Sequence, residues 1–272
     1  MKLKLKLKAF AASLVLAAAS GQAGATIQTG ANGELFLTVV SSDNLVSFTK
    51  DLGITMDSFL SGFAGASVSL STDAAWNQFL QLVTNPAAMI FSVAALNPSG
   101  TASTAGSISA ITTVAPGTSA ATMMQGTTNT QLTTGVQAAA SGYITAVNAL
   151  QSGVADGSSL SQAGTSAFAL NSNNAFNSFL NGQASFNQFG TIGNALSVFL
   201  VANGSGGAGG SITANQLFSG NGLTAANFLL TAGGQFSATS TAPVPEPGSW
   251  AMLLAGLLAV GAIARRRMSS SS

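Results

Sequence analysis

Ser47 and Lys50 are the first residues whose types and spacing could do chemistry, because they fit the pattern S-x-x-K. In that pattern a lysine can take the proton of a serine hydroxyl and make it a nucleophile for acyl transfer. This chemistry needs the serine at the start of a helix, whereas Leu45–Thr49 (LVSFT) is typical of a β-strand. Lys50 is also the only lysine between residues 26 and 245, so a further K-T-G element is missing. We therefore interpret the motif as the end of a strand with a solvated Lys50–Asp51 pair.

A second candidate is the glycine-rich run Gly204–Gly209, which fits G-x-G-x-x-G after a predicted strand. A dinucleotide site would also need a helix directly afterwards and an acid about 20 residues further on. Here Gly210 and Ser211 continue the loop, and the next acid is Glu246. The run therefore predicts a flexible loop. Asn203, which precedes it, begins an N-x-S glycosylation sequon.

Carboxylates near the N-terminus are the third candidate group, because they could bind Ca²⁺ or hydrolyse glycosides. Their spacing matches no calcium-loop pattern, and glycoside hydrolysis would need two acids that face inward. We interpret them mainly as solvated surface groups and keep carbohydrate binding, with or without calcium, as the alternative. The acids are Glu34, Asp43, Asp51, Asp57 and Asp73.

The composition excludes several classes of function. The 272 residues include no His and no Cys, which rules out Ser-His-Asp and Cys-His catalysis, ordinary zinc sites and disulfides. Only 6% of the residues are charged, and the stretch 26–245 holds one lysine and six acids, a formal charge of −5. Such a body cannot neutralise a phosphate backbone, so we expect no nucleic-acid partner. We also expect no enzymatic activity, no catalytic residue, no metal and no cofactor.

The N-terminus has the three parts of a secretory signal peptide. Lysines alternate with leucines over residues 1–8, the apolar run 9–19 follows, and Ala23 and Ala25 precede a cleavage site before Thr26. We therefore predict that residues 1–25 are a signal peptide and that the secretion translocon exports the chain.

The C-terminus predicts a membrane anchor. Residues 241–248 form a proline-rich linker that contains Val244, Pro245, Glu246 and Pro247. The uncharged segment 249–264 follows, about 24 Å long as a helix, and Trp250 and the arginines can extend its reach toward the roughly 30 Å hydrocarbon core. The tail 265–272 begins with Arg265, Arg266 and Arg267, which should stop transfer and stay in the cytoplasm.

This C-terminal arrangement resembles the PEP-CTERM sorting signal of Gram-negative bacteria. The resemblance rests on Val244-Pro245-Glu246-Pro247, the short apolar segment and the arginines of residues 265–267, in that order. The tail after the arginines is longer than in the family pattern. The resemblance implies export, transient anchoring in the inner membrane, processing by an exosortase-type membrane protease, and a final place at the cell surface or in an exopolysaccharide matrix.

Residues 26–240 are the part that we expect to be exported, the passenger. Their sequence pattern predicts a mixture of strands and helices. Strands are predicted at 34–40, 45–49, 88–95, 107–114, 196–201 and 228–231, and 235–240 is expected to be a closing edge strand. One helix is predicted from Trp76, Phe79, Leu80 and Val83, behind a cap at Ser71, Thr72 or Asp73. A longer helix is predicted from the stripe Leu132, Val136, Ala139, Tyr143, Ile144, Val147 and Leu150. A third, shorter helix is predicted around Phe176–Leu180.

These elements favour an α+β fold with a mainly antiparallel β-sheet or β-sandwich, helical insertions and the C-terminal transmembrane helix. Function then follows mainly from the two ends of the chain. We expect an exported surface or matrix protein whose partners are exopolysaccharide or further copies of itself. The alternative is a secreted carbohydrate-binding or carbohydrate-active protein that uses the N-terminal carboxylates.

Overall fold

The computed structural model describes residues 26–61, 67–114, 119–121, 127–151, 157–170, 188–217 and 225–241. The chain divides into two units, Met1–Ser240 and Thr241–Ser272. Apart from Thr241, every described residue belongs to the first unit. The signal peptide, linker residues 242–248, the predicted transmembrane segment and the predicted helix at Phe176–Leu180 lie outside the described residues, whereas Thr241, the first residue of the predicted linker, ends a strand.

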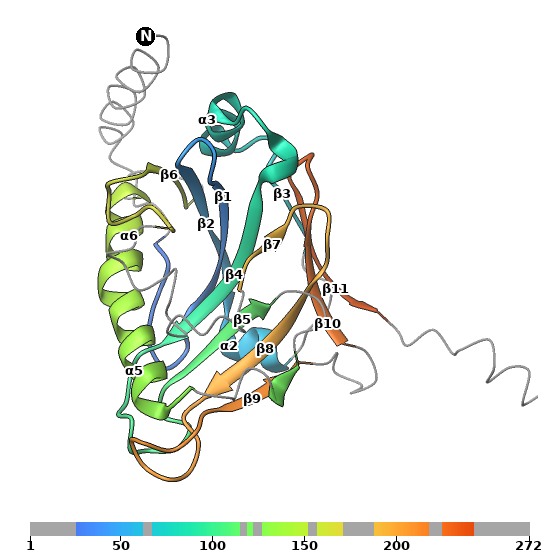
Figure 1. The fold of residues 1–272 in the computed structure, drawn as a ribbon. Helices are drawn as coiled ribbons and strands as arrows, with labels where there is room; N and C mark the ends of the chain where they lie inside the picture. The colour runs from blue at the N-terminus through green and yellow to red at the C-terminus, as the bar shows by residue number, and fades with distance from the viewer. Residues whose placement is uncertain are drawn as a thin grey trace, which may run out of the picture. The chain divides into compact units, whose positions relative to one another are not determined.

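The described strands form one sheet in the order β3-β11-β10-β8-β5-β4-β1-β2-β6, with β7 beside β4 and β9 beside β8 (Figure 1). Every strand pair with a described register is antiparallel. The strands are β1 (Glu34–Ser41), β2 (Val46–Thr55), β3 (Ser67–Ser69), β4 (Ile90–Asn97), β5 (Ser109–Val114), β6 (Ser158–Gln162), β7 (Gly190–Thr191), β8 (Leu196–Ala202), β9 (Thr213–Gln216), β10 (Ala225–Leu230) and β11 (Gln235–Thr241).

Helices occupy the connections between these strands. One group follows β2: α2 (Met56–Ser61), α3 (Ala74–Leu82) and the 3-10 turn η1 (Pro86–Ala88). The other group is a continuous helical rod made of α5 (Asn129–Ala138), the π-helical turn η2 (Ala139–Ile144) and α6 (Thr145–Gln151), which lies along one flank of the sheet (Figure 1). The rod begins at a capping box in which Thr128 and Gln131 satisfy each other's backbone amides.

Both faces of the sheet are buried, because the alternating side chains of each strand enter two different cores. On β1, Leu35, Leu37 and Val39 enter one core, and Phe36 and Val40 enter the other. The rod covers the core that holds Phe36, which we call the rod-side core. The other, the α3-side core, receives Trp76 and Phe79 from α3, Phe59 from α2, and Phe228 and Phe236 from β10 and β11.

The predicted antiparallel sheet with helical insertions is confirmed, and the described strands form one sheet rather than the two of a sandwich. The prediction of a closing edge at 235–240 is wrong. β11 lies between β10 and β3, since Phe236 pairs with Val68 of the short strand β3. Within the described part of the chain, no helix is long and apolar enough to cross a membrane.

Candidate functional site

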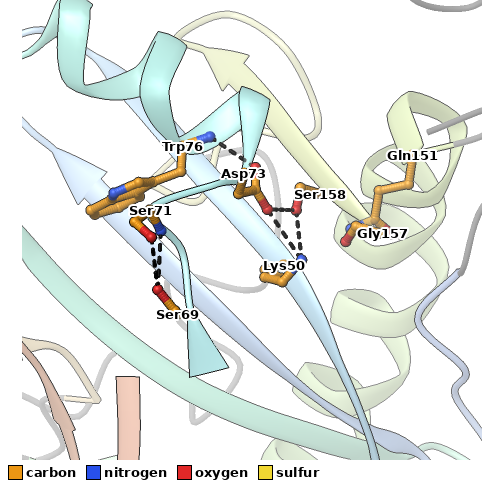
Figure 2. A network of polar contacts seen from close by, with 8 residues as sticks. All are labelled: Lys50, Ser69, Ser71, Asp73, Trp76, Gln151, Gly157 and Ser158. Carbon is orange, nitrogen blue, oxygen red and sulfur yellow. Dashed lines mark hydrogen bonds and ion pairs between the residues drawn. The ribbon is translucent and has the colours of Figure 1, made fainter. Parts of the chain in front are cut away.

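Three polar side chains from three elements meet at the edge of the α3-side core (Figure 2). Lys50 Nζ on β2 lies 3.1 Å from Asp73 Oδ2 at the start of α3 and donates to Ser158 Oγ on β6, also at 3.1 Å. The Ser158 hydroxyl in turn donates to Asp73 Oδ2. The Lys50 and Asp73 side chains are only 12% and 4% exposed. A charged pair is therefore enclosed in a protein that has few charges.

The register of the sheet places two of these groups side by side. Lys50 is the partner of Ser158 in the antiparallel pairing of β2 with β6, so both side chains project from the same face. The start of β6 is fixed by the Gly157 carbonyl, which accepts from the Asp51 amide at 2.9 Å and from Gln151 Nε2 of α6 at 2.7 Å.

Asp73 reaches the cluster because it caps α3. Its Oδ1 accepts a hydrogen bond from the Trp76 amide at 3.0 Å, which satisfies one of the open donors of the first helical turn. The predicted cap is confirmed at Asp73, one of the three positions that the sequence offered. The cap leaves Oδ2 for Lys50 and Ser158, so one carboxylate both starts a helix and holds a buried cation.

The structure separates the two residues of the S-x-x-K motif. Residues three apart on a strand point to opposite faces, so Ser47 projects toward the rod side and Lys50 toward α3. Ser47 Oγ contacts Ser161 Oγ at 2.8 Å and accepts from the Ala169 amide at 3.2 Å. The motif therefore does not form a nucleophile and base. The expectation of a solvated Lys50–Asp51 pair is wrong too, since Lys50 pairs with Asp73 and Asp51 lies on the other face.

Sequence reasoning missed a second buried polar group, centred on the single tyrosine of the chain. Tyr143 on η2 is fully buried, and its hydroxyl lies 2.7 Å from Thr49 Oγ1 and 3.2 Å from Thr38 Oγ1. Burial raises the pKa of the Tyr143 phenol to about 12. The stripe predicted Tyr143 as a core residue, which is confirmed, but it carried no sign of hydroxyl partners on β1 and β2.

The glycine-rich run does not form an open phosphate cradle. Its carbonyls face the start of α5: the Asn129 amide donates to Gly210 O at 2.8 Å, and the Thr130 amide donates to Ala208 O at 3.0 Å. Asn129 Nδ2 donates to Gly207 O at 2.7 Å. These contacts satisfy helix amides that a nucleotide phosphate would otherwise use. The predicted loop is confirmed, since the run forms neither helix nor strand, and hydrogen bonds hold it against the start of α5.

The sequon residue Asn203 takes part in the same hydrogen bonding between this loop and α5. Its side chain is 2% exposed, accepts from the Ile108 amide at 2.9 Å and donates to Thr133 Oγ1 at 3.1 Å. A glycan on this nitrogen would remove the bond to Thr133 and would have no room in the folded passenger.

The N-terminal carboxylates do not gather into a metal site. Among the described residues, no group of three or more acidic side chains is placed to bind a metal ion. Glu34 and Asp51 do lie near each other, on adjacent strands. Burial raises both pKa values, and the charge of Asp51 further raises that of Glu34. Asp43 and Asp57 are exposed, as expected of solvated groups, whereas Asp51 and Asp73 are buried.

The clearest evidence about function comes from the sequence that follows β11. Residues 243–267 match the family model of the PEP-CTERM protein-sorting motif. The chain carries a PEP-CTERM sorting motif. The match includes Pro245–Pro247 and the arginines of residues 265–267, and it lies outside the passenger. No curated protein and no solved structure matches the chain.

The PEP-CTERM motif marks an exported protein that exosortase, a membrane protein, processes and sorts to the cell surface. That much of the sequence interpretation is confirmed. The individual roles predicted for Val244–Pro247, Arg265–Arg267, Ala23 and Ala25 stay predictions, since these residues lie outside the described part of the chain.

Proposed function

We propose that the passenger is a non-enzymatic structural protein of the cell surface or of an exopolysaccharide matrix. After export through the translocon, the segment 249–264 holds it transiently in the inner membrane. Exosortase then processes it near Pro245–Pro247 and releases the passenger toward the matrix.

The distribution of charge carries this proposal. Among the described residues, every charged side chain lies between Glu34 and Asp73, although the described chain continues to Thr241. Two of these charges, on Lys50 and Asp73, are paired and buried. The rest of the described surface offers hydroxyls, amides and backbone groups, which can exchange hydrogen bonds with sugars without bringing like charges together.

The polar clusters also support a structural role. Lys50, Asp73 and Ser158 satisfy one another and lie against the core, so they offer little to a bound substrate. The Tyr143 hydroxyl is likewise engaged with two threonines. Both clusters tie elements of the fold together, which suits a protein whose task is to persist outside the cell.

The sorting half of the proposal is tested by fractionating the producing bacterium and recording the C-terminal peptide by mass spectrometry. Matrix-associated protein should lack residues 249–272, whereas a variant with Pro245, Glu246 and Pro247 changed to Ala should stay in the membrane with its arginines intact. The matched control replaces Ser270–Ser272 by Ala and should be processed normally. An intact arginine tail on wild-type matrix protein would contradict the proposal.

The matrix half is tested separately. Glycosidase treatment of the extracellular fraction should release the processed protein, and deletion of its gene should change the cohesion of the matrix. Normal processing with no release and no change in cohesion would overturn the matrix role and leave the sorting intact.

The alternative, a carbohydrate-binding or carbohydrate-active protein, is favoured by one observation, the proximity of Glu34 and Asp51. Asp51→Asn should abolish sugar binding or hydrolysis in that case, and calcium dependence would show as sensitivity to a chelator. Asp57→Asn is the matched control, because Asp57 is exposed on α2. A matrix protein should tolerate both substitutions.

A further inference from the structure

Lys50 and Asp73 bring a primary amine and a carboxylate together where few water molecules can reach them. Nζ and Oδ2 are 3.1 Å apart, and both side chains are almost entirely buried. An amine and a carboxylic acid can condense to an amide when they are held close together, and such proximity replaces most of the entropic barrier of a bimolecular reaction.

The third member of the cluster lies where a proton relay is needed. Condensation requires a neutral amine and a neutral acid, so one proton must move from Lys50 to Asp73. Lys50 Nζ donates to Ser158 Oγ, and the Ser158 hydroxyl donates to Asp73 Oδ2. Transfer of a proton along both hydrogen bonds neutralises both charges and leaves Ser158 unchanged.

The helix cap distinguishes the two carboxylate oxygens of Asp73. Oδ1 accepts from the Trp76 amide and can keep that bond as the oxygen of an amide carbonyl. Oδ2 receives the hydrogen bonds of Lys50 and Ser158, so it is the oxygen that gains protons and departs.

The surroundings favour the neutral product. Aromatic rings on the same two elements pack together: Phe48 lies 5.2 Å from Trp76, and Trp76 lies 5.5 Å from Phe79, measured between ring centroids. Keeping two charges beside such a core has a desolvation cost, and an amide carries none of that charge. Exclusion of water also opposes hydrolysis of the amide once it has formed.

We propose that Lys50 and Asp73 form an intramolecular isopeptide bond in the folded passenger, with Ser158 as the proton relay. Nζ attacks the Asp73 side-chain carbonyl carbon, and the bond from that carbon to Oδ2 breaks. Two of the three ammonium protons leave with Oδ2 as one water molecule, and the third stays on the amide nitrogen. No oxidant, reductant or other reactant is needed.

Such a bond would join β2 covalently to the start of α3. The chain has no cysteine, so disulfides cannot provide this kind of cross-link outside the cell. A link between residues 50 and 73 closes a loop that contains α2 and β3 and restricts the unfolded chain, as a disulfide would.

Trypsin provides a direct test, because Lys50 is the only lysine or arginine between residues 26 and 245. The exported protein is purified from the producing bacterium, denatured and digested. An acylated Lys50 is not a trypsin site, so the passenger should stay whole, and its intact mass should be lower than the sequence mass by one water molecule. Cleavage after Lys50 together with the full sequence mass would overturn the proposal.

Two variants refine the test. Lys50→Arg keeps a cation beside Asp73 but replaces the nucleophilic amine, so its passenger should be cut into two fragments and keep its full mass. Ser158→Ala keeps both reacting groups and removes the relay, so the fraction cut should rise well above that of the wild type. An uncut Ser158→Ala protein would overturn the relay, and the wild-type measurement decides the bond even if a variant fails to fold.

Discussion

Thr49 and Lys50 are neighbours on β2, yet their side chains enter opposite cores and meet different partners. Thr49 shares the Tyr143 hydroxyl with Thr38, and every member of that group is neutral. Lys50 meets the carboxylate of Asp73 and the hydroxyl of Ser158. Both groups are buried, and each connects β2 to a helix on its own side of the sheet.

The two groups should differ in how much free energy of unfolding is lost when one partner is removed. In the Tyr143 group, a missing hydroxyl leaves a neutral donor or acceptor unsatisfied, which costs about 1–3 kcal/mol. In the Lys50 group, a missing carboxylate leaves an uncompensated charge at the core, which costs about 3–5 kcal/mol. Loss of a partner on the α3 side of β2 should therefore lower the stability of the fold more than loss of a partner on the rod side.

The largest predicted effect comes from Asp73→Ala, which removes the partner of Lys50 and the cap of α3 together. We expect the free energy of unfolding to fall by about 3–5 kcal/mol, with about 1 kcal/mol of cap loss included. Urea denaturation followed by tryptophan fluorescence measures it, since Trp76 lies one turn away. Asp57→Ala, at an exposed position of α2, is the control and should change stability by less than about 0.5 kcal/mol. Equal losses of stability in the two variants would contradict the large contribution expected from the contacts of Asp73 with Lys50 and Trp76.

The next effect belongs to the rod side and appears only at high pH. Because the Tyr143 pKa is raised from 10 to about 12, the folded state keeps its phenol proton where the unfolded state has lost it. This contribution to stability is complete below pH 10 and is lost as the pH rises through 12, by about 3 kcal/mol in all.

The titration of Tyr143 can be read directly, because the chain contains a single tyrosine. The ultraviolet absorbance of the phenolate should appear with a midpoint near pH 12 in the folded passenger and near 10 after denaturation. Tyr143→Phe removes this absorbance signal. The free energy of unfolding of the variant should also fall less than that of the wild type as the pH rises from 10 to 12. A midpoint near 10 in the folded protein would mean that the hydroxyl is open to water.

The sequence predicted those elements whose burial rests on apolar periodicity. β1, β4, β5 and β8 alternate or run together as apolar residues, and α3 and the rod carry apolar stripes at helical spacing. It missed β3, β6 and β9, which read SVS, SSLSQ and TANQ. In β6 the buried serines are satisfied by partners far along the chain, and no local pattern reports such partners.

The same limit applies to the candidate sites. Asp73 was recognisable as a helix cap because capping is local, whereas its contacts with Lys50 and Ser158 span 23 and 85 residues. The sorting motif was recognisable because its three parts are contiguous and function as a linear address. The S-x-x-K pattern misleads for a related reason: its spacing has meaning on a helix, and the residues lie on a strand.

The smallest predicted effect tests whether the neutral side of β2 tolerates the loss of a hydroxyl. Ser47→Ala removes the acceptor of the Ala169 amide and one partner of Ser161, but Ser161 Oγ still donates to the Ala167 carbonyl at 2.8 Å. Two neutral hydrogen bonds are lost, the Ala169 amide loses its Ser47 acceptor, and no charge is exposed, so we expect about 1–2 kcal/mol of destabilisation in urea. Ser42→Ala, in the exposed turn before β2, should have almost no effect. If Ser47→Ala lowered the stability as much as Asp73→Ala, the neutral and the charged side of β2 would contribute equally to stability, and the comparison would fail.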